Sequence, residues 1–208
     1  KNTPFLNKKN IPIKKNIENI YKIKNINYSE ITKLNPKIIF ITNPSSFHID
    51  TVLKLKNLKN AYIFIEKPLD TKLYKIKKLL QIIKKNKLNI FYSSNLRFSD
   101  EFKYLKKIIS TKLMGKIYYN LIKYSQHLKT YHPYENFKKS YTSIKKLGGG
   151  INFTSIHEID LVNNLFKNTK KIKVILKKIA LSKLDINDFF VGTFKSKLNG
   201  YEIMSLLI

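Results

Sequence analysis

The side chains best suited to chemistry follow a run of three glycines, at 148–150, which are half of the six glycines in the chain. Thr154, His157, Glu158 and Asp160 come within a few positions of that run. Thr154 and His157 are three residues apart, so a helix would place them on one face. A histidine there can act as a general acid or base near neutral pH. Glycines before a helix allow a positive φ and let a ligand or another backbone come close.

A structural interpretation of this stretch stays open. The glycines could form only a tight turn, with His157 as a hydrogen-bonded surface or core histidine. We predict no metal site, because no second histidine follows one turn later and His48, His127 and His132 are far away in sequence.

A second candidate group lies at the end of an apolar run, AYIFIE (61–66), which predicts a buried strand. Glu66 and Lys67 fall at its carboxyl end, where open α/β sheets bind their ligands. An ammonium at that edge can lose its proton or polarise a carbinol oxygen. Taken alone, one lysine among many is more simply a solvated strand end. Together with the loop NPSSFH (43–48) and the glycine-led helix, it indicates one shared site.

The elements that must position these residues alternate through the first half of the chain. Continuous apolar runs predict buried strands, and apolar residues at helical spacing predict helices between them. The expected order is strand 37–42, helix 47–56, strand 61–66, helix 71–87 and strand 88–93. This order is typical of a parallel sheet wound with helices, so the fold class is α/β.

The second half has a different pattern and predicts an α+β domain with a mainly antiparallel sheet. We expect a helix at 98–111, a long strand at 115–128, a polar loop at 129–146, a helix at 151–166, and strands at 171–178, 188–196 and 201–208. Asn199 and Gly200 suit a hairpin turn between the last two strands. The predicted domains are therefore 1–94 and 95–208.

Composition excludes some classes of protein. The net charge of +28 could indicate binding to nucleic acid, but only one of the 41 basic residues is arginine and the lysines are spread over every segment. We therefore expect no nucleic-acid partner. The absence of cysteine excludes disulfides and thiolate metal sites and fits a reducing compartment. No apolar run approaches the roughly 20 residues that span a bilayer, so we expect no membrane partner and a cytoplasmic location.

Four motifs together resemble the glucose-fructose oxidoreductase, inositol dehydrogenase and rhizopine-catabolism family (Gfo/Idh/MocA), which are NAD(P)-dependent sugar oxidoreductases. They are ITNPSSFH (41–48), EKP (66–68), SNLRF (94–98) and GGGINFTSIHEID (148–160). The loop before the glycines is similar to a branch associated with surface polysaccharides and nucleotide sugars. The resemblance implies an incomplete Rossmann-type, doubly wound parallel sheet in 1–94 and a substrate-binding and catalytic α+β domain in 95–208.

The resemblance also implies roles for individual residues. It makes Lys67 and His157 the catalytic residues, with Asp160 as the structural follower of His157. It places these residues at NAD or NADP: Thr42, Asn43, Pro44, His48, Glu66, Lys67, Asn95 and Arg97. It places these at a sugar or nucleotide-sugar substrate: Lys67, Arg97, Thr154 and His157. A planar guanidinium at Arg97 suits carboxylate, phosphate or sugar oxygens. Pairing of subunits through the C-terminal sheet is also implied.

Two departures from the family pattern matter. Many members carry an aspartate one helical turn before the histidine, where this chain has Phe153 and Thr154, and a neutral hydroxyl cannot accept a proton as that carboxylate can. The glycine-rich turn for the pyrophosphate, and the residue that selects NAD or NADP, would precede Lys1. We therefore expect an internal fragment of a protein of roughly 300 residues, inactive by itself. The main alternative is a non-catalytic sugar- or cofactor-binding paralogue, and a more distant one is a basic nucleic-acid binder.

Overall fold

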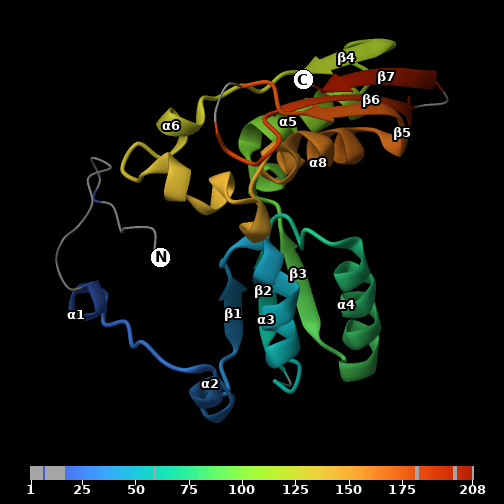
Figure 1. Ribbon diagram of the computed structural model, residues 1–208. Coiled ribbons are helices and arrows are strands. Elements are labelled where there is room, and N and C mark those ends of the chain that lie inside the picture. Colours follow the sequence, from blue (N-terminus) through green and yellow to red (C-terminus); the bar gives the residue numbers. More distant parts are fainter. Residues whose placement is uncertain (1–6, 8–16, 59, 181–182, 199–200, 208) are drawn as a thin grey trace.

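A three-stranded parallel sheet organises the first half of the chain (Figure 1). In this computed structural model, which describes residues 7, 17–58, 60–180, 183–198 and 201–207, the strands lie in the order β1 (Ile38–Ile41), β2 (Tyr62–Glu66) and β3 (Asn89–Ser93). The connections are α3 (His48–Lys54), preceded by a short 3-10 turn, and α4 (Leu73–Asn86). The predicted order of strands and helices is confirmed.

The core of this half lies between the sheet and its two connecting helices. Ile41, Ile63 and Ile65 are fully or almost fully buried and cluster with the helix residues Ile49 and Val52. Side chains alternate across a strand, so the neighbouring positions point to the opposite face. On that face Phe40, Phe64 and Phe91 stack in a row, with ring centroids 5.2 and 5.0 Å apart. The connecting helices of the described chain therefore cover one face of the sheet.

Two short helices precede the sheet and were not predicted. They are α1 (Ile17–Tyr21) and α2 (Tyr28–Leu34). The start of α2 has a recognisable signal, because Asn27 and Glu30 form a capping box in which the Glu30 carboxylate accepts the Asn27 amide at 2.7 Å. Ile31 of α2 packs against the core of the first half.

A mixed four-stranded sheet organises the second half. Its order is β4 (Tyr119–Ile122), β7 (Tyr201–Leu207), β6 (Phe189–Leu198) and β5 (Lys167–Lys177). The β5–β6 and β6–β7 pairs are antiparallel, whereas β4 is parallel to β7. Helices α5 (Asp100–Ser110) and α8 (Ile156–Leu165) lie along this sheet (Figure 1). The expectation of a mainly antiparallel sheet is confirmed.

Several predicted boundaries in this half were wrong. The expected strand at 115–128 is only the four residues of β4, because 123–126 leave the sheet and form the wall of a pocket. The loop at 129–146 contains three 3-10 turns and follows a short helix, α6 (Leu128–Tyr131). The helix at 151–166 is interrupted at Ser155, which separates α7 (Ile151–Thr154) from α8. The predicted Asn199–Gly200 turn lies outside the described residues, although β6 and β7 do pair.

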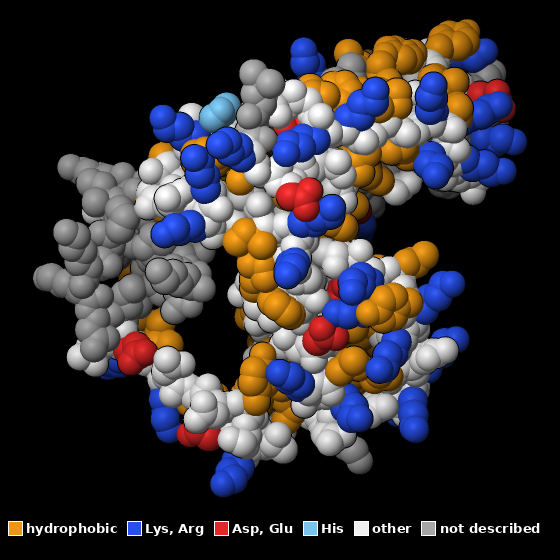
Figure 2. All heavy atoms as spheres, viewed as in Figure 1, with side chains coloured by type: hydrophobic (Ala, Val, Ile, Leu, Met, Phe, Trp, Pro, Cys, Tyr) orange, Lys and Arg blue, Asp and Glu red, His pale blue; other side chains and the backbone are white. Residues whose placement is uncertain are grey.

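Charge is spread over the surface rather than gathered. Figure 2 shows Lys and Arg side chains over both halves of the face it presents. None of the described helices is long and apolar enough to cross a membrane. The division into domains at residue 94 stays a prediction, and the change from one sheet to the other falls between β3 and α5.

Candidate active site

The carboxyl ends of all three parallel strands meet at one edge of the first sheet, since β1, β2 and β3 run in the same direction. Thr42 and Asn43 follow β1, Glu66 ends β2 with Lys67 directly after it, and Asn95 follows β3 closely. The sequence-predicted residues of the first half are therefore brought together. The second half closes over this edge through α7 and α8.

Lys67 joins the sheet edge to the glycine-led helix. Its ammonium donates to the main-chain oxygen of Thr154 at 3.3 Å. Burial lowers the pKa of Lys67, and the negative charges of Glu66 and Glu158 only partly oppose that effect. A lysine with a lowered pKa gives up a proton more readily than an exposed lysine does.

His157 lies in the first turn of α8 and lines a pocket on the second half. No residue of the described chain is hydrogen-bonded to its ring, so both nitrogens are available to a ligand. Burial lowers the pKa of His157, and the positive charge of Lys67 lowers it further, whereas Glu66 and Asp160 raise it. The imidazole is therefore neutral at neutral pH and able to accept a proton.

Thr154 also lines the pocket, but its hydroxyl is engaged within its own helix, where it donates to the Gly150 carbonyl at 3.2 Å. Its main-chain oxygen accepts the Lys67 ammonium. Thr154 therefore holds Lys67 through its backbone.

The first of the three glycines lies against the first half of the chain, and the second packs within its own half. Gly148 has φ +93°, and a Cβ there would lie 2.9 Å from side-chain atoms of both Ser45 and Thr71. A Cβ on Gly149 would lie 2.5 Å from the Thr142 carbonyl oxygen. Both positions therefore require glycine for close approach, the first to the loop after β1 and the second to the preceding turn. The prediction that the glycines permit such an approach is confirmed.

The loop after β1 presents polar atoms that have no partner. The Asn43 amide nitrogen donates to the Thr51 hydroxyl at 2.9 Å, whereas its oxygen, like the hydroxyl of Ser46, is buried without a hydrogen bond in the described structure. Such atoms at the carboxyl edge of a parallel sheet suit a bound ligand with donors and acceptors of its own. The residues present therefore fit a dinucleotide.

His48 is buried at the start of α3 and holds this loop in place. Its Nδ1 lies 2.8 Å from the Pro68 carbonyl oxygen, and its Nε2 lies 2.7 Å from the Asn43 carbonyl oxygen. The ring thus connects the loop after β1 to the turn after β2. Both ring nitrogens of His48 are therefore engaged by main-chain oxygens, and the side chain positions Asn43 and Pro68 rather than offering a nitrogen to a ligand.

Arg97 and Asp160 form an ion pair between the segment after β3 and α8. The Arg97 Nε donates to Asp160 Oδ2 at 2.8 Å, and a second guanidinium nitrogen donates to Oδ1. The Ser94 hydroxyl donates to the same carboxylate at 2.6 Å. Burial raises the pKa of Asp160, but the hydrogen bonds from Arg97 and Ser94 outweigh it and hold that pKa below its usual range. The predicted fork of Arg97 is thus engaged by the protein's own carboxylate.

Asn95 lies beside this pair and is exposed, and its side-chain oxygen accepts the Leu96 amide at 3.0 Å. Thr42 is likewise exposed and Pro44 is half-buried. These three residues border the edge without further side-chain partners that would assign them a role.

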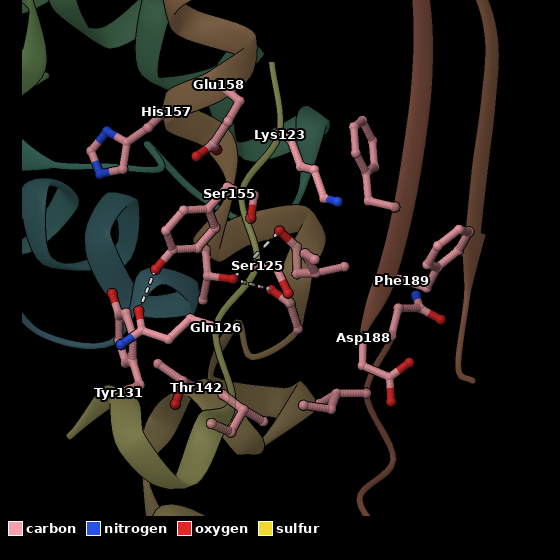
Figure 3. Close-up of a pocket in the computed structure, with 18 of the residues that line it drawn as sticks. Lys123, Ser125, Gln126, Tyr131, Thr142, Ser155, His157, Glu158, Asp188 and Phe189 are labelled. Carbon is pink, nitrogen blue, oxygen red and sulfur yellow. Dashed lines mark hydrogen bonds between the residues drawn. The ribbon is translucent and has the colours of Figure 1, made fainter. Parts of the chain in front are cut away.

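A pocket of about 480 Å³ opens beside His157 (Figure 3). Its walls come from the segment 123–126, from α6 to α8 and from the start of β6, and they include the rings of Tyr124, Tyr131, Phe189 and Phe190. Sequence reasoning missed the walls at 123–126 and 186–190, because the first was assigned to a strand and the second to a strand start. Within the described residues no three His, Cys, Asp or Glu side chains are grouped as a metal site would require.

Comparison with known proteins agrees with the fold. Residues 7–94 match the model of an oxidoreductase family with an NAD-binding Rossmann fold. No curated protein matches the chain in sequence. The expectations of a Rossmann-type α/β fold and of a nicotinamide dinucleotide as cofactor are confirmed.

Solved structures with a similar fold share little sequence. An NAD-binding protein from Listeria innocua is 16% identical with a TM-score of 0.74, covering 92% of this chain and 55% of its own. Myo-inositol 2-dehydrogenase from Lactobacillus plantarum is 22% identical with a TM-score of 0.66, and the match covers 92% of this chain and 53% of that protein. The WlbA dehydrogenase from Bordetella pertussis, solved with NADH and UDP-GlcNAcA, is 16% identical with a TM-score of 0.68. That match covers 86% of this chain and 54% of the dehydrogenase. The chain thus spans about half the length of these proteins.

Proposed function

We propose, from the match of residues 7–94 to the model of the Gfo/Idh/MocA family of oxidoreductases, that the protein containing this chain transfers a hydride between nicotinamide and a carbon of a sugar or nucleotide sugar. The observation that carries this proposal is the contact between the two halves of the site. Lys67, at the end of β2, donates to the main chain of Thr154, three residues before His157. A cation and a neutral imidazole thus lie at the edge where the cofactor binds.

The proposed mechanism divides the work between these two side chains. In the oxidation direction His157 accepts the proton of the substrate hydroxyl, and Lys67 polarises the same oxygen as it becomes a carbonyl. A nicotinamide cofactor held at this edge would supply the hydride acceptor in this direction and the hydride donor in the other. Protonated His157 then returns the proton to solvent, or to the oxygen in the reverse reaction. The lowered pKa of His157 suits the role of base at neutral pH.

Seven residues of the sheet edge are proposed to hold the cofactor, directly or through the segments that they fix. Thr42, Asn43 and Pro44 would lie along it, with the unpaired Asn43 oxygen as an acceptor. Glu66 and Asn95 would border the nicotinamide, and His48 and Arg97 would act through the segments that they fix.

Two observations support a sugar or nucleotide sugar as the substrate. The pocket beside His157 has aromatic walls and a few polar groups, as carbohydrate sites often do. Similar folds occur in an inositol dehydrogenase and in a dehydrogenase solved with a nucleotide sugar. A role in surface-polysaccharide synthesis and a cytoplasmic location are part of this proposal.

Self-association through the second sheet is proposed as well. Tyr119, Leu121 and Met204 are exposed apolar side chains of β4 and β7. Large exposed apolar side chains on neighbouring strands favour contact with another sheet.

The test uses the protein encoded by the complete reading frame, titrated with NADH and NADPH by fluorescence. Micromolar binding is expected, followed by turnover of at least one sugar, cyclitol or nucleotide sugar. Lys67→Ala and His157→Ala should each abolish turnover while leaving NADH binding largely intact. Unchanged turnover in both variants would refute the assignment.

The rival function is a non-catalytic sugar- or cofactor-binding paralogue. It is favoured by one observation, the neutral Thr154 whose hydroxyl is already engaged by the Gly150 carbonyl. Cofactor binding without turnover of any tested compound would support that rival.

A further inference from the structure

Two carboxylates, those of Asp188 and Glu158, line the pocket beside His157, and they differ in their hydrogen bonding. Asp188 lies at the start of β6, where its two oxygens accept the main-chain amides of Ile179 and Ala180 at 2.7 and 3.1 Å. Both oxygens of Asp188 therefore have hydrogen-bond partners within the protein, and the side chain holds the segment after β5 in place.

Glu158 is the carboxylate that keeps one oxygen without a hydrogen-bond partner. It lines the pocket directly after His157, and its Oε2 is buried without a hydrogen-bond partner in the described structure. Figure 3 shows its carboxylate leaving α8 on a different side from the His157 ring. An unpaired carboxylate oxygen is costly to bury, so a group that arrives with the ligand would be its natural donor.

The charges around Glu158 indicate which kind of ligand group could donate a hydrogen bond to its carboxylate. A carboxylate can accept from a hydroxyl, an amide or an ammonium. Burial raises the pKa of Glu158, and its own backbone amide and the positive charge of Lys67 only partly oppose that effect. Lys123 also lines the pocket. A second ammonium would be repelled by these lysines, and an anionic substituent would be repelled by Glu158 itself. A neutral donor therefore fits best.

The remaining walls suit a ring that carries such donors. Tyr124, Tyr131, Phe189 and Phe190 all line the pocket, so it offers flat apolar surfaces around its polar groups. The C–H faces of a sugar or cyclitol ring can pack on these side chains while its hydroxyls reach the polar ones.

We propose that Glu158 is a substrate-binding residue that accepts a hydrogen bond from a neutral hydroxyl near the reacting carbon, and so makes the site specific for a polyhydroxylated ring. This inference rests on the proposed function for the identity of the reacting carbon. It assigns to Glu158 a role in recognition, distinct from the proton transfer assigned to His157.

The first experiment measures thermal unfolding of the ligand-free protein from the complete reading frame. Glu158→Met removes the unpaired oxygen and keeps the apolar stem, so its unfolding midpoint should rise by about 2–4 °C. Asp188→Asn is the matched control, because it weakens two charge-assisted hydrogen bonds and should lower the midpoint. A lower midpoint for Glu158→Met would assign Glu158 a purely structural role and overturn the proposal.

The second experiment tests recognition directly with defined probes. Myo-inositol, glucose, UDP-glucose and UDP-N-acetylglucosamine, each with its set of deoxy analogues, are assayed for turnover with NAD and NADP and for binding by saturation-transfer NMR. For the preferred compound, one deoxy analogue should lose about 10- to 100-fold in kcat/KM or affinity with the wild-type protein. With Glu158→Ala the same analogue should lose no more than about 3-fold.

The outcomes separate this proposal from the proposed function. Turnover with equal discrimination in wild type and Glu158→Ala would overturn the role of Glu158 and leave hydride transfer intact. Binding without turnover, with selectivity that depends on Glu158, would support Glu158 and refute the oxidoreductase. A folded protein that neither binds nor oxidises any probe would overturn both.

Discussion

Arg97 and Asp160 clamp the helix that carries His157 to the end of the parallel sheet. The guanidinium engages both oxygens of the carboxylate, one of them at 2.8 Å, and Asp160 lies one helical turn after His157. The Ser94 hydroxyl completes the set. This geometry explains why the single arginine of a lysine-rich chain stands here, because an ammonium cannot make the same two-point contact.

Arg97→Lys should therefore destabilise the protein although it keeps the charge. We expect a loss of about 1–2 kcal/mol in the free energy of unfolding, since the Arg97 side chain is 38% exposed and water partly replaces its contacts. Urea denaturation measures the change. Lys103→Met is the control, because Lys103 pairs with Asp100 on the surface and should contribute less than about 0.5 kcal/mol. Equal losses in the two variants would show that the clamp is no stronger than a surface pair.

Close packing of the glycine run predicts a graded response to alanine. Gly148→Ala and Gly149→Ala should each cost about 2–4 kcal/mol, because the new methyl would lie 2.9 Å from Ser45 and 2.5 Å from the Thr142 carbonyl oxygen. Gly115→Ala is the control for backbone conformation alone, with φ +69° and no atom within 4 Å of its Cβ. It should cost only about 1 kcal/mol. Chemical denaturation measures the free energy of unfolding of the three variants. Similar losses of stability in all three would refute the packing argument.

The buried ring of His48 predicts that the two loops at the sheet edge depend on it. His48→Leu keeps the volume but removes both contacts, with the carbonyls of Pro68 and Asn43. We expect a loss of about 1–3 kcal/mol in unfolding free energy, together with weaker NADH binding. His127→Leu is the control, because His127 is exposed on the second half. NADH affinity that is unchanged in His48→Leu would show that the position of the loop does not matter for the cofactor.

The three parallel strands of the first half and the helices that connect them could be predicted from the sequence, because buried parallel strands are continuous apolar runs with short, strongly marked connections. The short helices α1 and α2 were missed. The sequence also brought Lys67 and His157 to one place, through motifs whose spacing the fold explains. The clamp of Arg97 was not foreseen. Nothing in the spacing of Arg97 and Asp160 along the chain indicates that they meet, since that contact depends on how the two sheets are placed.

The walls of the pocket were also beyond sequence reasoning. The segment 123–126 directly follows β4 and leaves the sheet to line the pocket, whereas the apolar pattern had predicted a strand that continues to residue 128. The unpaired oxygen of Glu158 is a similar case, because satisfaction of a polar group is a property of the packed structure.

The charges around His157 predict opposite shifts of its pKa in two variants. Burial and the positive charge of Lys67 both lower the pKa of His157, so Lys67→Met, which removes that cation, should raise it. Asp160→Asn removes an anion that raises it, so the pKa should fall further. The chain has four histidines, and NMR titration with His157→Gln as the assignment control follows this one directly.

The same shift fixes the pH dependence of the proposed reaction. Oxidation requires neutral His157, so kcat/KM should be constant at neutral pH and decline only as the pH falls through the lowered pKa, below about 6.5. In Asp160→Asn that acid limb should move to still lower pH, together with the NMR value. An acid limb that stays in place while the NMR titration of His157 moves would show that another group takes the proton.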